Sequence, residues 1–289
     1  MSYRSVFSPG MFSGQTIIVT GGGSGIGRCT AHELSSLGAH VVLTGRKIEK
    51  LEAVAAEIAE DGGESSHYAF DIRDEDAVRE TVRTIVAERG QIHGLVNNAG
   101  GQFLSPLASI SKNGFEAVVA TNLTGGFLMS REVFTQSMAD HGGAVVNMLA
   151  DMWRGMPGMG HSGAARSGME NLTRTAAIEW SVAGVRVNAV APGSIASSGL
   201  ENYDKAVSTN IRKMRHTVPL KRMGSEAEVS SAIVFLLSEG AAYITGSTIR
   251  IDGGAILSTR HLDFPDHDRS PEYNGFHRSV RPQVLDGEE

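Results

Sequence analysis

The hydrophobic and polar positions of this chain alternate between two patterns. Short apolar runs, the first at 17–19, predict buried strands, and each is followed by apolar residues at helical spacing. After the first run Ala31, Leu34 and Leu37 share one helical face, and Gly38 follows, where a glycine commonly ends a helix. The alternation continues to residue 251 and predicts repeated strand–helix units.

Six further strands and five further helices are expected. The strands are 40–44, 66–70, 94–97, 144–148, 185–190 and 248–251, and the helices are 48–60, 74–88, 115–138, 164–180 and 226–237. Asp74 is placed to cap the helix that follows it. Repeated units of this kind imply right-handed crossovers and a parallel sheet with helices on both faces. Ligands bind such sheets beyond the carboxyl ends of the strands, where the strand order reverses.

Two segments lie outside the pattern. One is 194–224, before the last helix, and the other is the polar tail at about 259–289, which contains Phe264, Tyr273 and Phe276. The tail either docks on a neighbouring subunit or is disordered, and the sequence leaves both open. No linker-like stretch divides the chain, so we expect a single domain over 1–289.

Composition narrows the class of protein. The chain has 289 residues, 41% of them hydrophobic, and a net charge of −6 without a basic, aromatic-rich tract, so we expect no nucleic-acid partner. Cys29 is the only cysteine, which excludes an internal disulfide and suits a reducing compartment; we expect it to be a buried helix residue rather than a nucleophile. No apolar run reaches membrane-spanning or signal-peptide length, so we expect a cytoplasmic protein without a membrane partner.

A glycine-rich turn, Thr20-Gly21-Gly22-Gly23-Ser24-Gly25-Ile26-Gly27, joins the first strand to the first helix. Backbone N–H groups and the positive end of a helix dipole at such a turn bind a pyrophosphate. A plain strand–helix turn is the alternative. Further motifs follow in order: Asp71-Ile72, Asn97-Asn98-Ala99-Gly100, Asn122, Pro192-Gly193 and Asp252-Gly253-Gly254.

Together these motifs resemble the short-chain dehydrogenase/reductase family over about residues 12–257. The resemblance implies a doubly wound Rossmann-type three-layer sandwich with a seven-stranded parallel sheet, a nicotinamide dinucleotide, no metal, a homotetramer, and a lid over the substrate at 194–224. It also implies cofactor-binding residues. These are Gly21, Ser24, Gly25, Ile26 and Gly27 at the pyrophosphate and ribose, Asp71 and Ile72 at the adenine, Asn98, Ala99 and Gly100 along the cleft, and Pro192, Gly193 and Ile195 at the nicotinamide.

The end of the second strand, Thr44-Gly45-Arg46-Lys47, bears on the choice of cofactor. An acidic residue there binds the ribose hydroxyls of NAD and repels a 2′-phosphate, but this chain has Gly45 in its place. Arg46 can fork onto a phosphate, which favours NADP(H) over NAD(H). The alternative is that Arg46 stacks on the adenine or faces solvent.

The chain departs from the usual Ser, Tyr and Lys of this family. Asn147-Met148-Leu149-Ala150 stands where Asn-x-Ser-Ser is expected, and Ser162 and Arg166 stand at the Tyr and Lys positions. Arg166 can bind the cofactor ribose but does not give up a proton at neutral pH. The usual relay for ketones and alcohols is therefore in doubt.

The segment His161-Ser162-Gly163-Ala164-Ala165-Arg166 instead resembles the branch that contains trans-2-enoyl-CoA and 2,4-dienoyl-CoA reductases. In that branch the acid can move one helical turn, here to Glu170, and the residue matching Asn122 contacts the substrate carbonyl. We expect Asn122, Ser162, Arg166 and Glu170 to be catalytic. Asp151 and His161 are alternative acids, and Glu170 is alternatively part of a surface ion pair with its neighbouring arginines.

Two regions fit a large apolar substrate. Basic residues of the lid can meet the phosphates of coenzyme A or simply face solvent; they lie beside Tyr203 and are Lys205, Arg212, Lys213, Arg215, His216, Lys221 and Arg222. The methionine-rich loop 152–159 suits an acyl or terpenoid chain.

Three functions remain open. The leading one is NADP(H)-dependent reduction of an activated C=C bond, in an acyl-CoA. The second is dehydrogenation of an apolar alcohol, because the chain also resembles bacterial citronellol dehydrogenase-like proteins. The third is a non-catalytic dinucleotide sensor, suggested by the loss of Ser, Tyr and Lys.

Overall fold

The computed structural model describes residues 2–202, 213–258 and 265–286. Its main feature is a seven-stranded sheet in the order β3-β2-β1-β4-β5-β6-β9, in which every pair is parallel. The strands are β1 Thr16–Thr20, β2 His40–Gly45, β3 Glu64–Ala69, β4 Gly94–Asn97, β5 Gly143–Met148, β6 Val185–Pro192 and β9 Thr248–Ile251. The order reverses between β1 and β4, so the predicted doubly wound Rossmann-type fold is confirmed.

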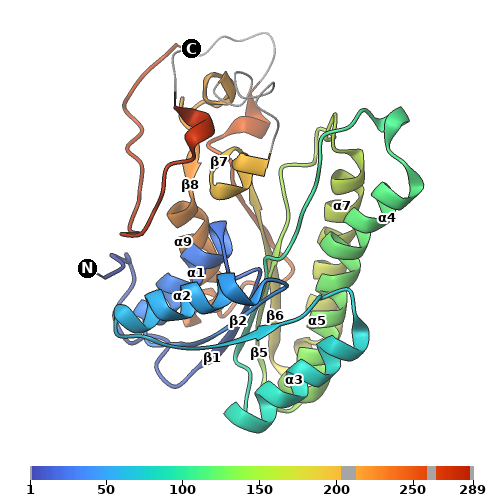
Figure 1. Cartoon of the computed structure of the whole chain (residues 1–289), viewed down its shortest axis with the longest axis vertical. Coiled ribbons are helices and arrows are strands. Elements are labelled where there is room, and N and C mark those ends of the chain that lie inside the picture. Colours follow the sequence, from blue (N-terminus) through green and yellow to red (C-terminus); the bar gives the residue numbers. More distant parts are fainter. Residues whose placement is uncertain (1, 203–212, 259–264, 287–289) are drawn as a thin grey trace.

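Helices cover both faces of the sheet (Figure 1). One layer contains α1 (Gly25–Ser36), α2 (Ile48–Glu60) and α9 (Glu226–Leu237). The other contains α3 (Glu75–Arg89), α5 (Gly125–Val133) and α7 (Gly160–Glu179). Because successive strand residues point to opposite faces, Ile17 packs in the first core and Ile18 in the second, and each core buries one apolar face of its helices. Cys29 is buried in α1, as expected.

The long helix differs from the predicted 115–138. It begins as α4 (Lys112–Val119), where the Ser111 hydroxyl accepts a hydrogen bond from Gly114 N–H, and ends as α6 (Ala139–His141). Two π-helical turns interrupt it, at Ala120–Thr124 and Phe134–Met138. Such turns shift side chains relative to a regular helix and are frequent at functional sites. The first one carries Asn122.

Other boundaries differ from the predicted ones by one to four residues, among them the starts of α7 and β3. Helix α7 starts at Gly160 instead of 164. Its first turn buries the polar side chains of His161 and Ser162, so no apolar pattern in the sequence marks this turn. Strand β3 begins at Glu64 instead of 66, since this polar edge strand pairs only with β2. In contrast α2, β4, α9 and β9 have the predicted bounds, and Asp74 caps α3 through Asp76 N–H and Ala77 N–H.

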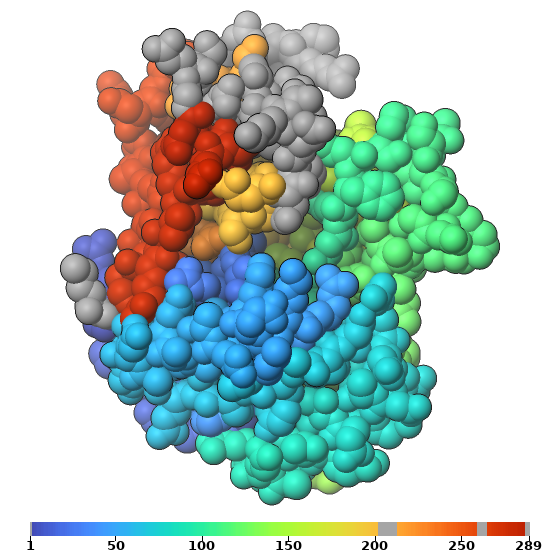
Figure 2. Space-filling view, viewed as in Figure 1, coloured from blue at the N-terminus to red at the C-terminus, as the bar shows by residue number. Residues whose placement is uncertain are grey.

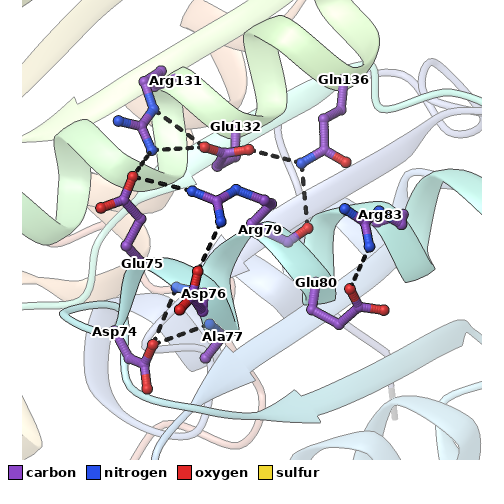
Figure 3. Close-up of polar contacts among 10 residues, drawn as sticks. All are labelled: Asp74, Glu75, Asp76, Ala77, Arg79, Glu80, Arg83, Arg131, Glu132 and Gln136. Carbon is purple, nitrogen blue, oxygen red and sulfur yellow. Dashed lines mark hydrogen bonds and ion pairs between the residues drawn. The ribbon is translucent and has the colours of Figure 1, made fainter.

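An ionic network joins α3 to α5 (Figure 3). The Arg131 guanidinium lies 2.6 Å from a Glu75 carboxylate oxygen and 2.7 Å from one of Glu132. Gln136 donates hydrogen bonds to Glu132 and to the Arg79 carbonyl, 2.8 and 3.2 Å away. These contacts hold α3 against the long helix that carries Asn122.

The lid segment contains a small parallel pair, β7 (Ile195–Ala196) and β8 (Gly224–Ser225). The predicted lid residues Tyr203, Lys205 and Arg212, and Phe264 of the tail, lie outside the described residues. No helix in the described ranges is long and apolar enough to cross a bilayer.

The described part of the tail packs on its own chain. Its Phe276 ring stacks on Tyr3 at 5.8 Å, and the Arg28 guanidinium lies 5.0 Å from the centre of the same ring. Arg278 pairs with Asp61 at 3.0 Å. In Figure 2 the red tail extends along one side of the molecule to the blue N-terminal residues. Residues 265–286 therefore pack on their own chain, an arrangement that the sequence analysis did not predict.

Candidate active site and cofactor cleft

The glycine-rich turn requires its glycines. Gly21 and Gly25 have φ of +67° and +58°, where other residues are strained. A Cβ on Gly27 would lie 2.4 Å from the Gly21 carbonyl oxygen, so the first turn of α1 packs directly on the turn. The N–H of Gly21 donates to the Thr44 carbonyl at 2.8 Å, which fixes the turn beside the end of β2. This is the strand–turn–helix context that a pyrophosphate site needs.

Asn98 holds the turn in place. Its Nδ2 donates to the Thr20 carbonyl at 2.9 Å, while the Thr20 hydroxyl accepts from the N–H groups of Asn98 and Ala99 at 3.0 and 2.9 Å. The ends of β1 and β4 are thereby tied together at the point where the strand order reverses. The Asn98 side chain thus positions the cleft, and the backbone of Ala99 and Gly100 lines it.

A cavity of about 220 Å³ lies at the predicted adenosine end of the cleft. The glycine turn, the end of β2 and the predicted adenine neighbours form its walls, together with Lys47, Lys50 and Arg73, which the sequence analysis did not single out. Asp71 accepts two hydrogen bonds from Arg73 Nε, at 2.9 and 3.0 Å, and this guanidinium keeps the pKa of Asp71 below its usual range. Arg46 is exposed at the rim, and the carboxylate typical of an NAD site is absent at Gly45.

Asn122, Arg166 and Gly100 meet at the carboxyl ends of β4 and β5. Asn122 is buried, and its carboxamide makes two hydrogen bonds to the backbone of Gly101, one accepted at 2.9 Å and one donated at 3.0 Å. A Cβ on Gly100 would lie 2.6 Å from Arg166 Nη2 and 2.9 Å from Asn122 Oδ1. The structure therefore brings together two of the predicted catalytic residues beside the cofactor cleft.

Arg166 is a buried cation without a carboxylate among its hydrogen-bond partners in the described ranges. Its Nη1 donates to the Met148 carbonyl, and its Nε has no partner there. Burial lowers the pKa of Arg166 to about 10. Such an unsatisfied charge is costly unless a ligand supplies an acceptor. The hydroxyl groups of a cofactor ribose, or an oxygen that becomes negative during a reaction, fit this site.

Ser162 is buried one helical turn before Arg166. Its hydroxyl donates to Gln102 Oε1 at 2.6 Å, so the loop after Gly101 is held against α7. Gln102 is a site residue that the sequence analysis missed; its position directly after the Asn-Ala-Gly motif was the available signal. His161 is buried beside the Phe103 ring, whose centre is 4.4 Å away, and its Nε2 has no partner in the described part of the chain.

Glu170 is not placed with Arg166. Its carboxylate accepts a hydrogen bond from Arg174 at 2.6 Å, and the Arg174 side chain is 59% exposed. Residues four apart on a helix advance by 400°, so a row of such steps drifts by about 40° each time. The row that starts at Ser162 thus drifts around the helix, and the Glu170 side chain, 13% exposed, makes with Arg174 the ion pair foreseen as an alternative.

Asp151 lies at the end of β5, where its N–H donates to the Pro192 carbonyl at 3.2 Å. Burial raises the pKa of the Asp151 carboxyl, and the negative Asp252 raises it further. Pro192 and Gly193 lie between these two acids, because β6 lies between β5 and β9 in the sheet. On the side of Asp252 the approach is close, since a Cβ on Gly193 would lie 2.9 Å from the Asp252 Cα. The predicted nicotinamide neighbours and a protonatable carboxyl are therefore adjacent.

The fold and this cleft define a class, a nicotinamide dinucleotide-dependent oxidoreductase with an atypical reaction centre. A family model described as Enoyl-(Acyl carrier protein) reductase matches residues 21–255. The chain belongs to the short-chain dehydrogenase/reductase family, and it is an enzyme of that family.

Relatives of differing activity resemble the chain. A peroxisomal 2,4-dienoyl-CoA reductase of Danio rerio is 36% identical, covering 89% of this chain and 86% of the relative. A glucose 1-dehydrogenase of Gluconobacter oxydans is 38% identical over 85% of this chain and 93% of the relative. A solved structure of a citronellol catabolism dehydrogenase from Pseudomonas aeruginosa is 68% identical, with a TM-score of 0.80, covering 88% of this chain and 99% of that one.

Proposed function

We propose that this enzyme reduces an activated C=C bond of an enoyl-CoA-type thioester with NADP(H). The observation that carries the proposal is the pair of fixed hydrogen-bond donors, Asn122 and Arg166, at a centre where Ser162 replaces the usual tyrosine. Reduction of a ketone needs an acid that protonates the oxygen. Reduction of a conjugated thioester instead needs donors that stabilise a negative oxygen while the proton goes to carbon.

Each residue has a stated part in this proposal. The nicotinamide cofactor, when bound, supplies the hydride that adds to the β-carbon of the substrate. Asn122 Nδ2 has a second N–H besides the one bonded to Gly101, and Arg166 Nε–H is buried without a partner in the described ranges. These donors bind the thioester oxygen or the ribose. Ser162, through Gln102, fixes the loop that shapes the cleft.

NADP(H) is proposed because cations surround the end of β2. Arg46, Lys47, Lys50 and Arg73 line the adenosine cavity, and Arg73 is already paired with Asp71. A 2′-phosphate in this cavity adds negative charge beside Arg46, which can bind two of its oxygens. NAD(H) is less favoured, because Gly45 has no carboxylate to bind the ribose hydroxyls of that cofactor.

The acyl chain is assigned to the methionine-rich loop. Met152 and Met156 pack with Leu149 and Met169 beside the end of β5, which gives an adaptable apolar wall. The lid is a weaker partner for coenzyme A than expected. Arg222 already binds Glu228 at 2.6 Å and two carbonyl groups of the tail, so it holds the tail instead of facing a ligand.

Dehydrogenation of an apolar alcohol is the second candidate. The 68% identical relative named for citronellol catabolism favours it, and the same apolar wall suits a terpenoid. A tetrameric state and a cytoplasmic location are also proposals. Exposed Phe127 on α5, together with Ile178 and Val182 near the end of α7, supports an oligomer.

A substrate panel tests the proposal. NADPH oxidation is followed with crotonyl-CoA, a longer 2-enoyl-CoA, a 2,4-dienoyl-CoA, citronellal and a simple ketone. Turnover of the thioesters is expected. Turnover confined to citronellal contradicts C=C reduction and favours the alcohol dehydrogenase, and NADPH binding without any turnover favours a sensor.

A further inference from the structure

The backbone at Asp151 places its carboxyl beside the reaction centre. The N–H groups of Leu149 and Asp151 donate to the carbonyls of Val190 and Pro192, at 2.7 and 3.2 Å, so the β5–β6 ladder continues past the end of β5. Asp151 thereby lies level with Pro192 and Gly193, the segment assigned to the nicotinamide. The Met148 carbonyl, three residues earlier, binds the Arg166 guanidinium. Asp151 is thus fixed next to the elements that border the proposed substrate.

One oxygen of the Asp151 carboxyl lacks a hydrogen-bond partner among the described residues. This atom, Oδ1, is buried. A buried ionised carboxylate usually collects donors, whereas a protonated one can remain with fewer. This oxygen therefore suits a carboxyl group that holds a proton for transfer.

The charged neighbours of Asp151 are engaged elsewhere. Asp252 accepts hydrogen bonds from the N–H groups of Gly254 and Ile256, at 3.0 and 3.2 Å, so its carboxylate is fixed near Asp151. Arg154 donates to the carbonyls of Ser258 and Ile256, and the Arg250 guanidinium lies 5.6 Å from the centre of the Trp153 ring. The two arginines act to lower the pKa of Asp151, but burial and Asp252 outweigh them.

The other acids at the site are less suited to repeated proton transfer. The Glu170 carboxylate is already paired with Arg174 at 2.6 Å. The His161 side chain is fully buried against Phe103, so a proton lost from it is not readily replaced from solvent. Asp151 is only partly buried as a residue and can exchange its proton between turnovers.

We propose that Asp151 is the general acid that delivers the proton to carbon in the thioester reduction proposed above. Hydride addition to the β-carbon moves the C=C electron pair to the thioester oxygen and forms an enolate. The enolate then re-forms its C=O bond, and its α-carbon takes the proton of the Asp151 carboxyl. Asp151 is left as a carboxylate and is reprotonated from solvent, so each turnover consumes one hydride and one proton.

The test compares Asp151→Asn with Glu170→Gln, each of which exchanges a carboxyl for a carboxamide of the same shape. With a thioester that the wild type reduces, D151N is expected to lose about 10²- to 10⁴-fold in kcat, as removal of a general acid does. E170Q is expected to stay within about threefold, since the Glu170 carboxylate is already paired with Arg174 and a carboxamide can still accept that hydrogen bond. The wild-type rate falls as the pH rises through the raised pKa of Asp151, and D151N lacks this limb. NADPH binding, followed by fluorescence, confirms that both variants are folded.

Carboxyl ¹³C NMR of the cofactor-free protein gives a second readout. The signal missing in D151N should titrate above the ordinary range of an aspartate. An active D151N that keeps the wild-type loss of rate with rising pH overturns the role of Asp151 and leaves C=C reduction standing. A wild type that reduces no thioester overturns the proposed function, and the role of Asp151 with it.

Discussion

Replacing Arg166 by methionine separates what this buried cation contributes to folding from what it contributes to binding. Burial lowers the pKa of Arg166 to about 10. A lowering of this size corresponds to a desolvation cost of ~3 kcal/mol, at about 1.4 kcal/mol for each tenfold change in proton affinity. The hydrogen bond to the Met148 carbonyl recovers about 1.5–3 kcal/mol, as bonds from charged donors do. The two contributions nearly cancel in the absence of ligand.

Methionine has a similar length and no charge, so R166M should change the free energy of unfolding by less than about 1.5 kcal/mol. Its affinity for NADP(H) should fall at least tenfold, about 1.4 kcal/mol, because the donors that Arg166 reserves for a ligand are gone. Urea unfolding monitored by circular dichroism measures the first effect. Fluorescence titration with NADPH measures the second.

Arg186→Met is the matched control. Arg186 is also partly buried, but its guanidinium donates to three carbonyls at the end of α9, those of Leu236, Leu237 and Ser238, at 2.7–3.2 Å. R186M should therefore lose ~3 kcal/mol of stability and keep its NADPH affinity. The opposite pattern, an R166M that unfolds easily and still binds NADPH, would refute the view that Arg166 is held ready for a ligand.

Three other changes test separate parts of the structure. Arg46→Glu should raise the KM for NADPH about 10- to 100-fold while NADH kinetics change little, and an unaltered ratio of kcat/KM for the two cofactors would argue against a 2′-phosphate site. Gly27→Ala should abolish NADPH binding in a titration, because its Cβ would lie 2.4 Å from the Gly21 carbonyl oxygen; unchanged binding would show that the turn is not the pyrophosphate site. Burial acts to raise the pKa of Asp61, but hydrogen bonds from Arg278 and His277 outweigh it and hold this pKa below its usual range. The ionised Asp61 therefore stabilises the folded state above about pH 4, and this contribution is lost as the pH falls through the folded-state pKa. Asp61→Asn should accordingly flatten the loss of thermal stability between about pH 5 and pH 3, and parallel wild-type and variant curves would contradict this.

Local patterns in the sequence predicted most of the fold. Strands such as β1 have a continuous apolar centre, at 17–19, that is buried on both faces, and helices such as α2 repeat apolar residues on one face, so pattern and structure agree closely. Strand β3 is polar and lies at an edge, where pairing with β2 alone sets its length. The π turn around Asn122 depends on how the long helix packs, and no local pattern encodes it.

The site was only partly predictable. Order and spacing of motifs identified the glycine turn, Asn122 and Arg166, because these lie at the ends of predicted strands or on a predicted helix. Arg166 and Arg174 are each one helical turn from Glu170, so spacing alone could not show which of them pairs with it. The structure pairs Glu170 with Arg174, and Arg166 donates to the Met148 carbonyl. Gln102 escaped notice, and the packing of Phe276 on Tyr3 was not predicted, because the partners are distant in sequence.

The most direct test of C=C reduction is to follow the hydride itself. Wild-type enzyme is incubated with NADPH deuterated at the transferred position and with a 2-enoyl-CoA, and the product is examined by NMR and mass spectrometry. Reduction of the C=C bond places one deuterium on the β-carbon of a saturated acyl-CoA, with the α-carbon proton drawn from solvent. Deuterium on a carbinol carbon, with the C=C bond intact, would contradict it.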